Sequence, residues 1–283
     1  MAVISVLMSV YGKERPAYLS RALRSIGTGQ TRTPDEIVLV ADGPLTEALE
    51  NEITAFRAEL LLEKKKLHFL VIRLEENRML GRALAAGMKY CSGEFVARMD
   101  SDDIAVPERL EKEERFLLLR PDIAAVGGDI AEFETEGQTL RVKHMPSEPE
   151  ELYRYGKLRN PLNHMTVMFR KAAVEKAGGY RHFPYLEDYD LWTRLLSGGA
   201  KIANIPEVLV NARIGSDFSK RRGGTEYFKQ YKVLRSEQLK LGYLTKAEYA
   251  GSLVLTFGMT MQPSGLRDAV YKRLRNTGRF TIS

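Results

Sequence analysis

The first 127 residues alternate between two hydrophobic patterns, and this alternation constrains the fold more than any other feature. Short apolar runs that end in turn residues are typical of buried strands, and longer segments with apolar residues three and four apart are typical of helices. Strands are expected at residues 2–10, 36–40, 67–73, 94–99 and 123–127, with helices over 16–26, 45–62, 79–90 and 107–119. Because parallel neighbouring strands need crossover connections, the pattern predicts an α/β fold with a mostly parallel central sheet and helices on both faces.

The alternation stops after Gly128. Later segments of the same domain are expected to form two antiparallel strands and a short helix, at residues 129–143, 166–170 and 187–196. The remaining pattern is helical and includes Thr245 and Glu248 at capping-box spacing. The chain is therefore expected to form one domain over residues 1–224 with a helical C-terminal appendage over residues 225–283.

Composition and charge narrow the class of protein. The chain has 43 Lys and Arg against 37 Asp and Glu, and 44% of its residues are hydrophobic, as in folded soluble domains. Its single cysteine, Cys91, excludes a disulfide framework and a Cys-rich metal site. No run of about 18 uncharged apolar residues occurs, so a cytoplasmic location is expected. The net charge of +6 is compatible with nucleic acid, anionic lipid or phosphate ligands and does not choose among them.

Polar residues follow the expected strands at the places where parallel sheets bind ligands. Ligands bind beyond the carboxyl ends of such strands. The candidate binding residues at these positions are Ser9, Tyr11, Asp42, Asn77 and Asp100–Asp103. Acids at two of these places repel a phosphorylated ligand unless a divalent cation or basic residues lie between them. A metal is therefore expected.

The sequence Asp100-Ser101-Asp102 is the sharpest of these signals. In an extended segment, residues i and i+2 point to the same side, so both carboxylates can face one pocket. Carboxylate oxygens are the ligands that Mg²⁺ and Mn²⁺ prefer. The alternative is an acidic turn at the start of the helix that Pro107 opens, since Asp is favoured at N-caps.

Other ways of binding phosphate are disfavoured. The sequence has no G-x-G-x-x-G after the first strand and no G-x-x-x-x-G-K-[ST] anywhere, which argues against Rossmann dinucleotide binding and P-loop hydrolysis. The negative charge of a bound phosphate must then be balanced by a metal ion and by basic side chains. Arg213 and the basic cluster around Arg221 are candidates, and a solvated loop is the alternative for them.

A second group of acids precedes the expected helix at residues 187–196. Asp188 can face a cleft at the start of this helix and accept a proton from a substrate hydroxyl, or it can serve only to cap the helix. His164 lies just ahead of an apolar strand. It is a candidate for a role near metal, phosphate or acceptor, although a lone histidine is more often a structural residue.

Four motifs occur in order at residues 4–11 (ISVLMSVY), 40–44 (VADGP), 99–104 (MDSDDI) and 186–192 (LEDYDLW). With them the chain resembles the family 2 glycosyltransferases, in particular bacterial enzymes of capsule, exopolysaccharide and O-antigen assembly of the amylovoran-biosynthesis type. The resemblance implies a GT-A fold, a nucleotide-sugar donor with UDP as the expected nucleotide, a Mn²⁺ or Mg²⁺ ion, and inversion at the anomeric carbon. It also implies nucleotide-sugar binding within residues 1–128 and an acceptor and catalytic part within residues 129–224.

On the base side of the donor, the resemblance implies the following roles. Ser9 and Tyr11 line the base pocket, Asp42 accepts a hydrogen bond from the base, and Arg78 lies near the position that reaches its far edge. Family members often read N-x-G-[LI]-G at this turn, whereas this chain has Met79 where glycine is usual. The resemblance therefore does not determine the backbone conformation of this turn or the contact of Arg78 with the base.

On the phosphate side, the resemblance assigns Asp100 to the first acid, which faces the ribose and the metal. It assigns Asp102 to the metal ligand that bridges to the diphosphate. Arg213 falls where such enzymes place a basic residue against the diphosphate, and Arg221 belongs to the same donor side.

On the acceptor side, the resemblance assigns Asp188 to the catalytic base. Glu187 beside it holds the acceptor or the loop, Trp192 lies in the same motif, and His164 matches a recurring histidine of less settled role.

The expected function is transfer of a hexose or N-acetylhexosamine from a nucleotide-sugar to a hydroxyl of a lipid-linked saccharide in bacterial surface polysaccharide synthesis. Residues 266–278 have the pattern of a basic amphipathic helix. They are a candidate for contact with an anionic membrane surface on the inner face of the cell membrane, or for a helix packed on the catalytic domain.

Two other functions are weighed against this one. A sugar-phosphate nucleotidyltransferase also uses paired acids and a metal, but such enzymes usually carry a glycine-rich basic loop after the first strand, where this chain is poor in glycine. A nucleic-acid-binding protein fits the net charge, but the basic residues are interspersed with acids and form no recognition motif, so no nucleic-acid partner is expected.

Overall fold

The computed structural model describes residues 2–63, 66–214 and 224–262 of the chain. The chain forms two compact units, Met1–Arg213 and Ile214–Ser283, and each is described by itself.

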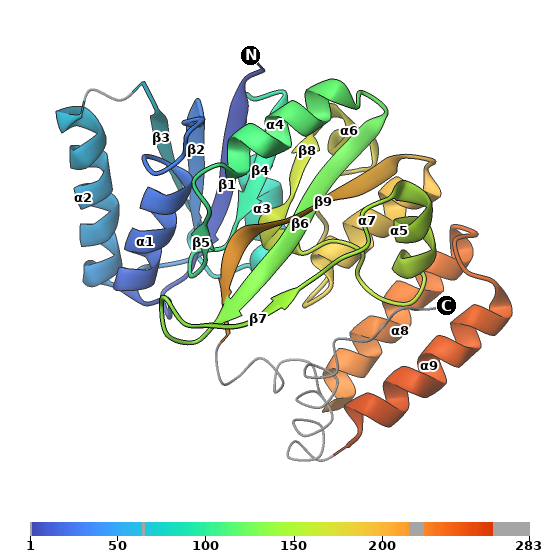
Figure 1. Cartoon of the computed structure of the whole chain (residues 1–283). Helices are drawn as coiled ribbons and strands as arrows, with labels where there is room; N and C mark the ends of the chain where they lie inside the picture. Colours follow the sequence, from blue (N-terminus) through green and yellow to red (C-terminus); the bar gives the residue numbers. More distant parts are fainter. Residues whose placement is uncertain (1, 64–65, 215–223, 263–283) are drawn as a thin grey trace. The chain divides into compact units, whose positions relative to one another are not determined.

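The first unit is built on one mixed sheet (Figure 1). Its first four strands are parallel and lie in the order β3-β2-β1-β4. They are β1 (Ile4–Val10), β2 (Glu36–Ala41), β3 (His68–Arg73) and β4 (Phe95–Met99). These strands confirm the alternating pattern of the sequence, and their carboxyl ends meet at one edge of the sheet.

Beyond β4 the sheet continues in the order β8-β6-β9-β5, and β7 pairs with β6. The strands are β5 (Ile104–Ala105), β6 (Ile123–Phe133), β7 (Thr139–Lys143), β8 (Met168–Arg170) and β9 (Lys201–Arg213). The antiparallel pairings of β7 and β8 confirm the expected antiparallel segments. The strand β8 lies between β4 and β6 in the sheet, although it follows both of them in the sequence.

The sequence analysis missed β9, the longest strand of the sheet. It runs parallel to β6 from the pair Ile123 and Lys201 to the pair Phe133 and Arg213. The register shifts where Gly128 pairs with Ile205 and Asp129 pairs with Val208, so β9 bulges around Pro206 and Glu207. Proline removes a ladder hydrogen bond, which is why this segment lacks the sequence pattern of a regular strand.

Helices cover both faces of the sheet, as expected. On one face lie α1 (Pro16–Ile26), α2 (Glu47–Leu62) and α4 (Arg109–Leu119), whose buried side chains share a core with alternate residues of β1, β2 and β4. In Figure 1, α1 and α4 lie in front of the strands and α3 (Leu80–Met88) lies behind them. The helix α7 (Glu187–Ser197) contacts α3, and α5 (Pro149–Gly156), α6 (Lys171–Lys176) and a short 3₁₀ turn (His164–Thr166) complete the unit.

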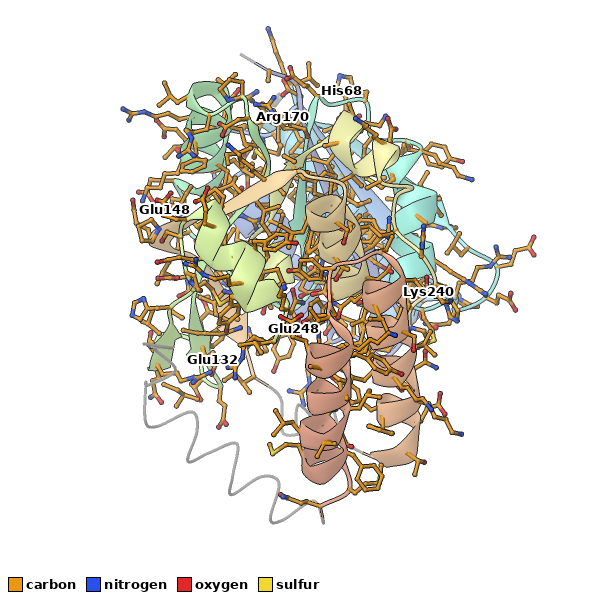
Figure 2. The ribbon with its side chains drawn as sticks, turned by 90° about the vertical axis from the view of Figure 1, so that its right-hand side faces the viewer. His68, Glu132, Glu148, Arg170, Lys240 and Glu248 are labelled. Carbon is orange, nitrogen blue, oxygen red and sulfur yellow. The ribbon has the colours of Figure 1, made fainter. Side chains whose placement is uncertain are left out.

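The second unit contains α8 (Gly224–Lys240) and α9 (Lys246–Thr260), which confirms the helical C-terminal pattern. Figure 2 labels Lys240 at the end of α8 and Glu248 near the start of α9. The predicted capping box is present: the Glu248 N–H donates to Thr245 Oγ1 at 3.2 Å, and the Thr245 N–H donates to Glu248 Oε2 at 2.7 Å. Arg221 and residues 266–278 lie outside the described residues. Within the described ranges, no helix combines the length and apolar character needed to cross a bilayer.

Candidate active site

The strand ends bring together the residues predicted to bind the donor. In the parallel register, Val10 pairs with Ala41 and Met8 pairs with Met99. Ser9 and Tyr11, at the end of β1, are therefore flanked by Asp42, which follows β2, and Asp100, which follows β4. Their exposure differs, because Tyr11 is 43% exposed and Asp42 is buried at 4%.

Asp42 joins two loops at this edge. Its Oδ1 accepts a hydrogen bond from the Arg78 N–H at 2.7 Å, and its carbonyl oxygen accepts one from Asn77 Nδ2 at 3.3 Å. The close approach depends on Gly43, where a Cβ would lie 2.7 Å from the Asn77 nitrogen and where φ is +87°. The structure thus places the Arg78 backbone beside the Asp42 carboxylate, while the Arg78 Nε lies 3.6 Å from Glu76 Oε1.

The turn after Asn77 explains why glycine suits the position of Met79. Met79 has φ 66° and ψ 157°, in a region that is essentially restricted to glycine because a Cβ clashes there. Met79 therefore adopts a backbone conformation that favours glycine, and it carries strain.

Three carboxylates cluster after β4. Asp100, Asp102 and Asp103 each offer an oxygen, and these three atoms lie within 4.8 Å of one another. Asp103 Oδ1 accepts a hydrogen bond from the Arg213 N–H at 2.7 Å, whereas Asp103 Oδ2 is buried and has no partner among the described residues. An oxygen-only donor set with an unmatched buried carboxylate oxygen fits a hard divalent cation.

The pKa values of the clustered acids also fit a site for a divalent cation. Burial raises the pKa of Asp102 to about 7, and the negative charges of Asp100 and Glu14 add to the rise. Burial, followed by the negative charges of Asp100 and Asp102, raises the pKa of Asp103 well above its usual value. Mutual repulsion of this kind is relieved by a bound cation. Sequence analysis included Asp103 among the acids that follow the strand, but assigned the metal only to Asp100 and Asp102.

Arg213 holds this acidic turn from the end of β9. Its Nε donates to the Asp102 carbonyl oxygen at 3.0 Å, and its guanidinium lies 3.7 Å from the Tyr18 ring centroid and 4.5 Å from that of Phe133. The two aromatic rings fix the guanidinium by cation–π contacts. The structure therefore places Arg213 next to the acids, with aromatic contacts that the sequence did not indicate.

The acids at 187 and 188 begin α7. Asp188 Oδ1 accepts the Tyr189 N–H at 2.7 Å, and Asp188 Oδ2 accepts a hydrogen bond from Asn160 Nδ2 at 2.5 Å. Burial raises the pKa of Glu187 to about 8, and the negative charges of Asp188 and Asp100 also raise it. The charge of Asp100 thus acts on Glu187, which belongs to the second group of acids. Asn160 was not selected from the sequence, because only the fold brings it to α7.

His164 and Trp192 lie beneath the site rather than on its surface. His164 Nε2 is 2.9 Å from the Tyr180 hydroxyl, and its ring centroid is 6.1 Å from that of Trp192. Burial, followed by the positive charge of Arg98, lowers the pKa of His164 well below its usual value, so the ring is neutral. Trp192 is 0% exposed, so its side chain is packed in the interior and does not lie on the surface.

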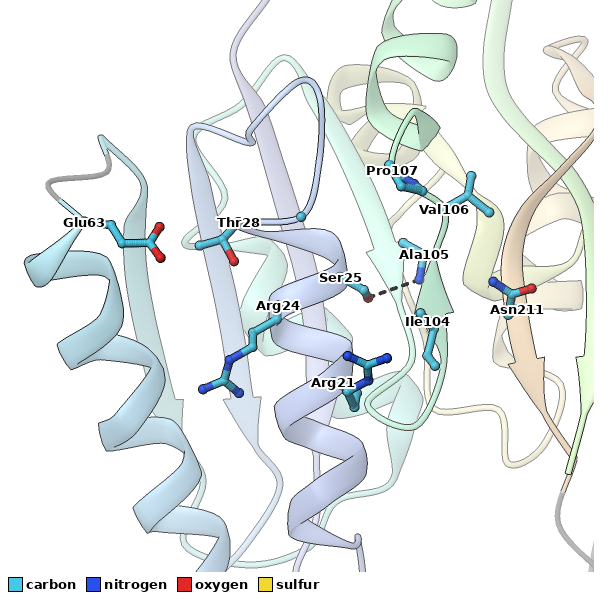
Figure 3. A pocket seen from close by; sticks show the side chains of 11 residues that line it. Arg21, Arg24, Ser25, Thr28, Glu63, Ile104, Ala105, Val106, Pro107 and Asn211 are labelled. Atoms are coloured by element: carbon cyan, nitrogen blue, oxygen red, sulfur yellow. Dashed lines mark hydrogen bonds between the residues drawn. The ribbon is translucent and has the colours of Figure 1, made fainter. Parts of the chain in front are cut away.

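A cavity of about 470 Å³ lies on the α1 side of the sheet (Figure 3). It is lined in part by Arg21 and Arg24 of α1 and by residues 104–107. Both arginines are paired with acids, Arg21 with Glu136 and Arg24 with Glu59. None of the site residues described above lines this cavity.

Sequence and structure comparisons identify relatives of the chain. The family profile described as Glycosyl transferase family 2 matches residues 5–176. The chain is 41% identical over 227 residues to the amylovoran biosynthesis glycosyltransferase AmsE of Erwinia amylovora, covering 80% of this chain and 82% of the relative. It is 32% identical over 271 residues to the UDP-Gal:alpha-D-GlcNAc-diphosphoundecaprenol beta-1,3-galactosyltransferase of Escherichia coli, covering 95% of each.

A crystal structure of S. aureus TarS 1-349 in complex with UDP-GlcNAc matches with a TM-score of 0.65 at 19% identity, covering 90% of this chain and 71% of that chain. This likeness shows that the fold is that of the GT-A glycosyltransferases, as the sequence predicts. A profile match over more than half of the chain, together with relatives above 30% identity over most of their length, shows that the chain belongs to glycosyltransferase family 2.

Proposed function

We propose that the chain is an inverting, divalent-metal-dependent enzyme that moves a hexose or N-acetylhexosamine from a UDP-sugar to a hydroxyl of a lipid-linked saccharide. The observation that carries the proposal is the cluster of Asp100, Asp102 and Asp103, with its unmatched buried oxygen in the described part of the chain. Family membership makes the nucleotidyltransferase and nucleic-acid-binding alternatives weaker.

On the donor side, the proposal uses the edge formed by β1, β2 and β4. The exposed ring of Tyr11 offers a face on which a uracil can stack, and Asp42 and Arg78 lie together beside it. Asp100, Asp102 and Asp103 would hold Mn²⁺ or Mg²⁺, which would offset the negative charge that builds on the leaving diphosphate. Side chains placed in advance for that charge lower the barrier more than they tighten the ground state.

On the acceptor side, Asp188 takes the proton of the attacking hydroxyl. The acceptor oxygen forms a bond to the anomeric carbon while the bond from that carbon to the diphosphate breaks, and its electron pair leaves with UDP. Attack from the face opposite the diphosphate inverts the configuration. Asn160 holds Asp188 Oδ2, so the base is oriented before the acceptor binds.

The names of the relatives support the class of acceptor. One relative acts in amylovoran biosynthesis, and another is named for a diphosphoundecaprenol-linked acceptor, so a role in bacterial surface polysaccharide synthesis is proposed here. Residues 266–278 are proposed to bind an anionic membrane surface, where such an acceptor resides. Pelleting with anionic liposomes tests this part: equal pelleting of the full chain and of a chain ending at residue 265 would contradict it.

A panel of nucleotide-sugars tests the proposal as a whole. Thermal stabilisation and hydrolysis of each donor are measured with Mn²⁺, with Mg²⁺ and with EDTA. The expected result is stabilisation by one or more UDP-sugars that EDTA removes. Stabilisation that persists in EDTA would refute metal dependence, and stabilisation by donors of another nucleotide alone would refute the UDP assignment.

A further inference from the structure

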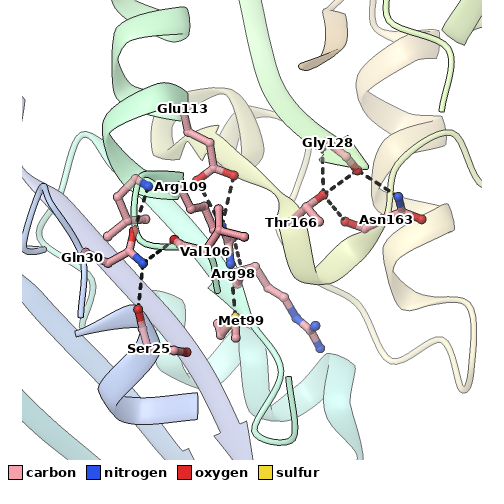
Figure 4. A network of polar contacts seen from close by, with 11 residues as sticks. Ser25, Gln30, Arg98, Met99, Val106, Arg109, Glu113, Gly128, Asn163 and Thr166 are labelled. Atoms are coloured by element: carbon pink, nitrogen blue, oxygen red, sulfur yellow. Dashed lines mark hydrogen bonds and ion pairs between the residues drawn. The ribbon is translucent and has the colours of Figure 1, made fainter. Parts of the chain in front are cut away.

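A buried arginine lies between the two groups of acids. Arg98 is the fourth residue of β4 and is 1% exposed. Its neighbours Ala97 and Met99 belong to the core shared with α1 and α4, so by the alternation of a strand the Arg98 side chain faces the opposite side of the sheet. Figure 4 shows its guanidinium directed away from Arg109 and Glu113, although its carbonyl oxygen accepts a hydrogen bond from Arg109 Nη2 at 2.7 Å.

The contacts of Arg98 are few for a buried charge. Its Nη2 lies 2.5 Å from Asp100 Oδ1. Its Nε and Nη1 are buried and meet no hydrogen-bond acceptor in the described ranges. Unmatched buried N–H groups are costly, and an apolar side chain of similar length usually serves packing at least as well. Packing alone therefore does not account for an arginine at this position.

The charge of Arg98 acts on both sides of the site. Burial raises the pKa of Asp102, Asp103 and Glu187, and the positive charge of Arg98 acts against the rise in all three. Arg98 itself stays charged: burial works to lower its pKa, but the charge of Asp100 and the hydrogen bond to it outweigh burial. The guanidinium is thus a buried cation that contacts Asp100 and whose charge acts on acids of both motifs.

We propose that Arg98 is a positioning residue that orients Asp100. By occupying Oδ1 of Asp100, the guanidinium leaves Oδ2 for a divalent cation or a donor hydroxyl and prevents the carboxylate from rotating. The inference rests on the proposed function, because it assumes that Asp100 belongs to the donor and metal site. It does not require that Arg98 touch substrate.

Two substitutions separate orientation from charge. Arg98→Met removes both the charge and the fork of N–H donors, whereas Arg98→Lys keeps the charge but cannot reproduce the guanidinium geometry. If Arg98 orients Asp100, both variants bind Mn²⁺ about 10- to 100-fold more weakly, as is typical when a partner of a metal ligand is removed. The readout is a titration with Mn²⁺ alone, followed by electron paramagnetic resonance, which needs no turnover.

The decisive comparison is made in the Asp100→Asn background. There, adding Arg98→Met leaves Mn²⁺ affinity unchanged, because Arg98 acts through the Asp100 carboxylate. An effect of Arg98→Met that persists in this background would overturn the proposal, as would tighter Mn²⁺ binding or wild-type affinity in Arg98→Lys. Each of these results would mean that Arg98 acts on the metal through its charge and not by orienting the Asp100 carboxylate.

Stability measurements exclude a merely structural role. Arg235 is a fully buried arginine that bonds Tyr231 and Gln238 in the second unit, so Arg235→Met is the matched control. It is expected to lower the melting temperature without changing Mn²⁺ affinity. Loss of affinity in Arg98→Met that only parallels unfolding would overturn the inference. If wild type binds Mn²⁺ but not UDP, the proposed donor fails while the Arg98 comparison still stands.

Discussion

The strained turn at Met79 allows a test in which one Cβ atom is the only difference. Met79 is 38% exposed, so substituting it removes some side-chain contact as well as strain. Comparing Met79→Ala with Met79→Gly cancels the loss of the side chain, because both variants lack it. The two differ only in the Cβ that makes φ 66° and ψ 157° unfavourable.

The expected magnitude follows from two opposing contributions. A non-glycine residue in this region costs about 1–3 kcal/mol, which Met79→Gly relieves. Glycine in turn costs about 0.5–1 kcal/mol through the greater freedom of the unfolded chain. Met79→Gly should therefore be more stable than Met79→Ala by about 1 kcal/mol, whereas at an ordinary position the order is reversed. For a unit of this size, that is a difference of about 2–4 °C in melting temperature.

Urea and thermal unfolding of the two variants, followed by circular dichroism, give the comparison. UDP binding in Mn²⁺ is the control, because the Arg78 N–H to Asp42 contact next to this turn should survive in both. If Met79→Gly is less stable than Met79→Ala by the usual cost of glycine, the turn is not strained and the reasoning fails.

Four further predictions concern the site. Asp102→Ala should abolish the Mn²⁺-dependent part of UDP binding in calorimetry, and equal affinity in variant and wild type at saturating metal would contradict its assignment as a ligand. Asp188→Asn should bind UDP nearly as well as wild type while losing transfer, and substantial residual transfer would remove it from the base role. Gly81→Ala should lose about 1–3 kcal/mol and slow transfer, because its Cβ would lie 2.3 Å from the Arg181 carbonyl oxygen and 3.0 Å from Glu187 Cβ; wild-type stability would show that the loop yields freely. Since the folded-state pKa of Glu187 is raised from 4.5 to about 8, the metal-free protein should lose stability as pH rises through this range, and Glu187→Gln should lose less, because Asp102 and Asp103 still titrate in it; an equal loss in both proteins would show that burial does not shift Glu187.

The sequence predicted those parts of the site that are written in short motifs. Asp100 and Asp102 were found because two carboxylates two residues apart directly follow a buried strand, and strand ends can be recognised from periodicity. Arg98 was missed because its meaning depends on which side of the sheet it faces and on what packs there. Asn160 was missed for a similar reason, since it reaches Asp188 across 28 residues of chain.

The fold was also predictable where the sequence pattern is regular. Helices and parallel strands with regular apolar spacing appeared at the expected places. The strand β9 did not, because Pro206 and the bulge around it interrupt the pattern, and its pairing with β6 is visible only in three dimensions. Trp192 was assigned to the acceptor side from its place in an acidic motif, whereas its full burial depends on the packing of α7 and could not be predicted from the motif.

The interleaving of β8 between β4 and β6 affects how the protein is made. During synthesis, β4 and β6 emerge before the residues of β8 that pair with both of them, and β9 follows later still. Until β8 has been synthesised, the edges of β4 and β6 that pair with it have no partner strand. Unpaired strand edges favour pairing between different chains. Residues 1–128 should therefore fold poorly when expressed alone. The segments before and after residue 128 therefore depend on each other to complete the sheet.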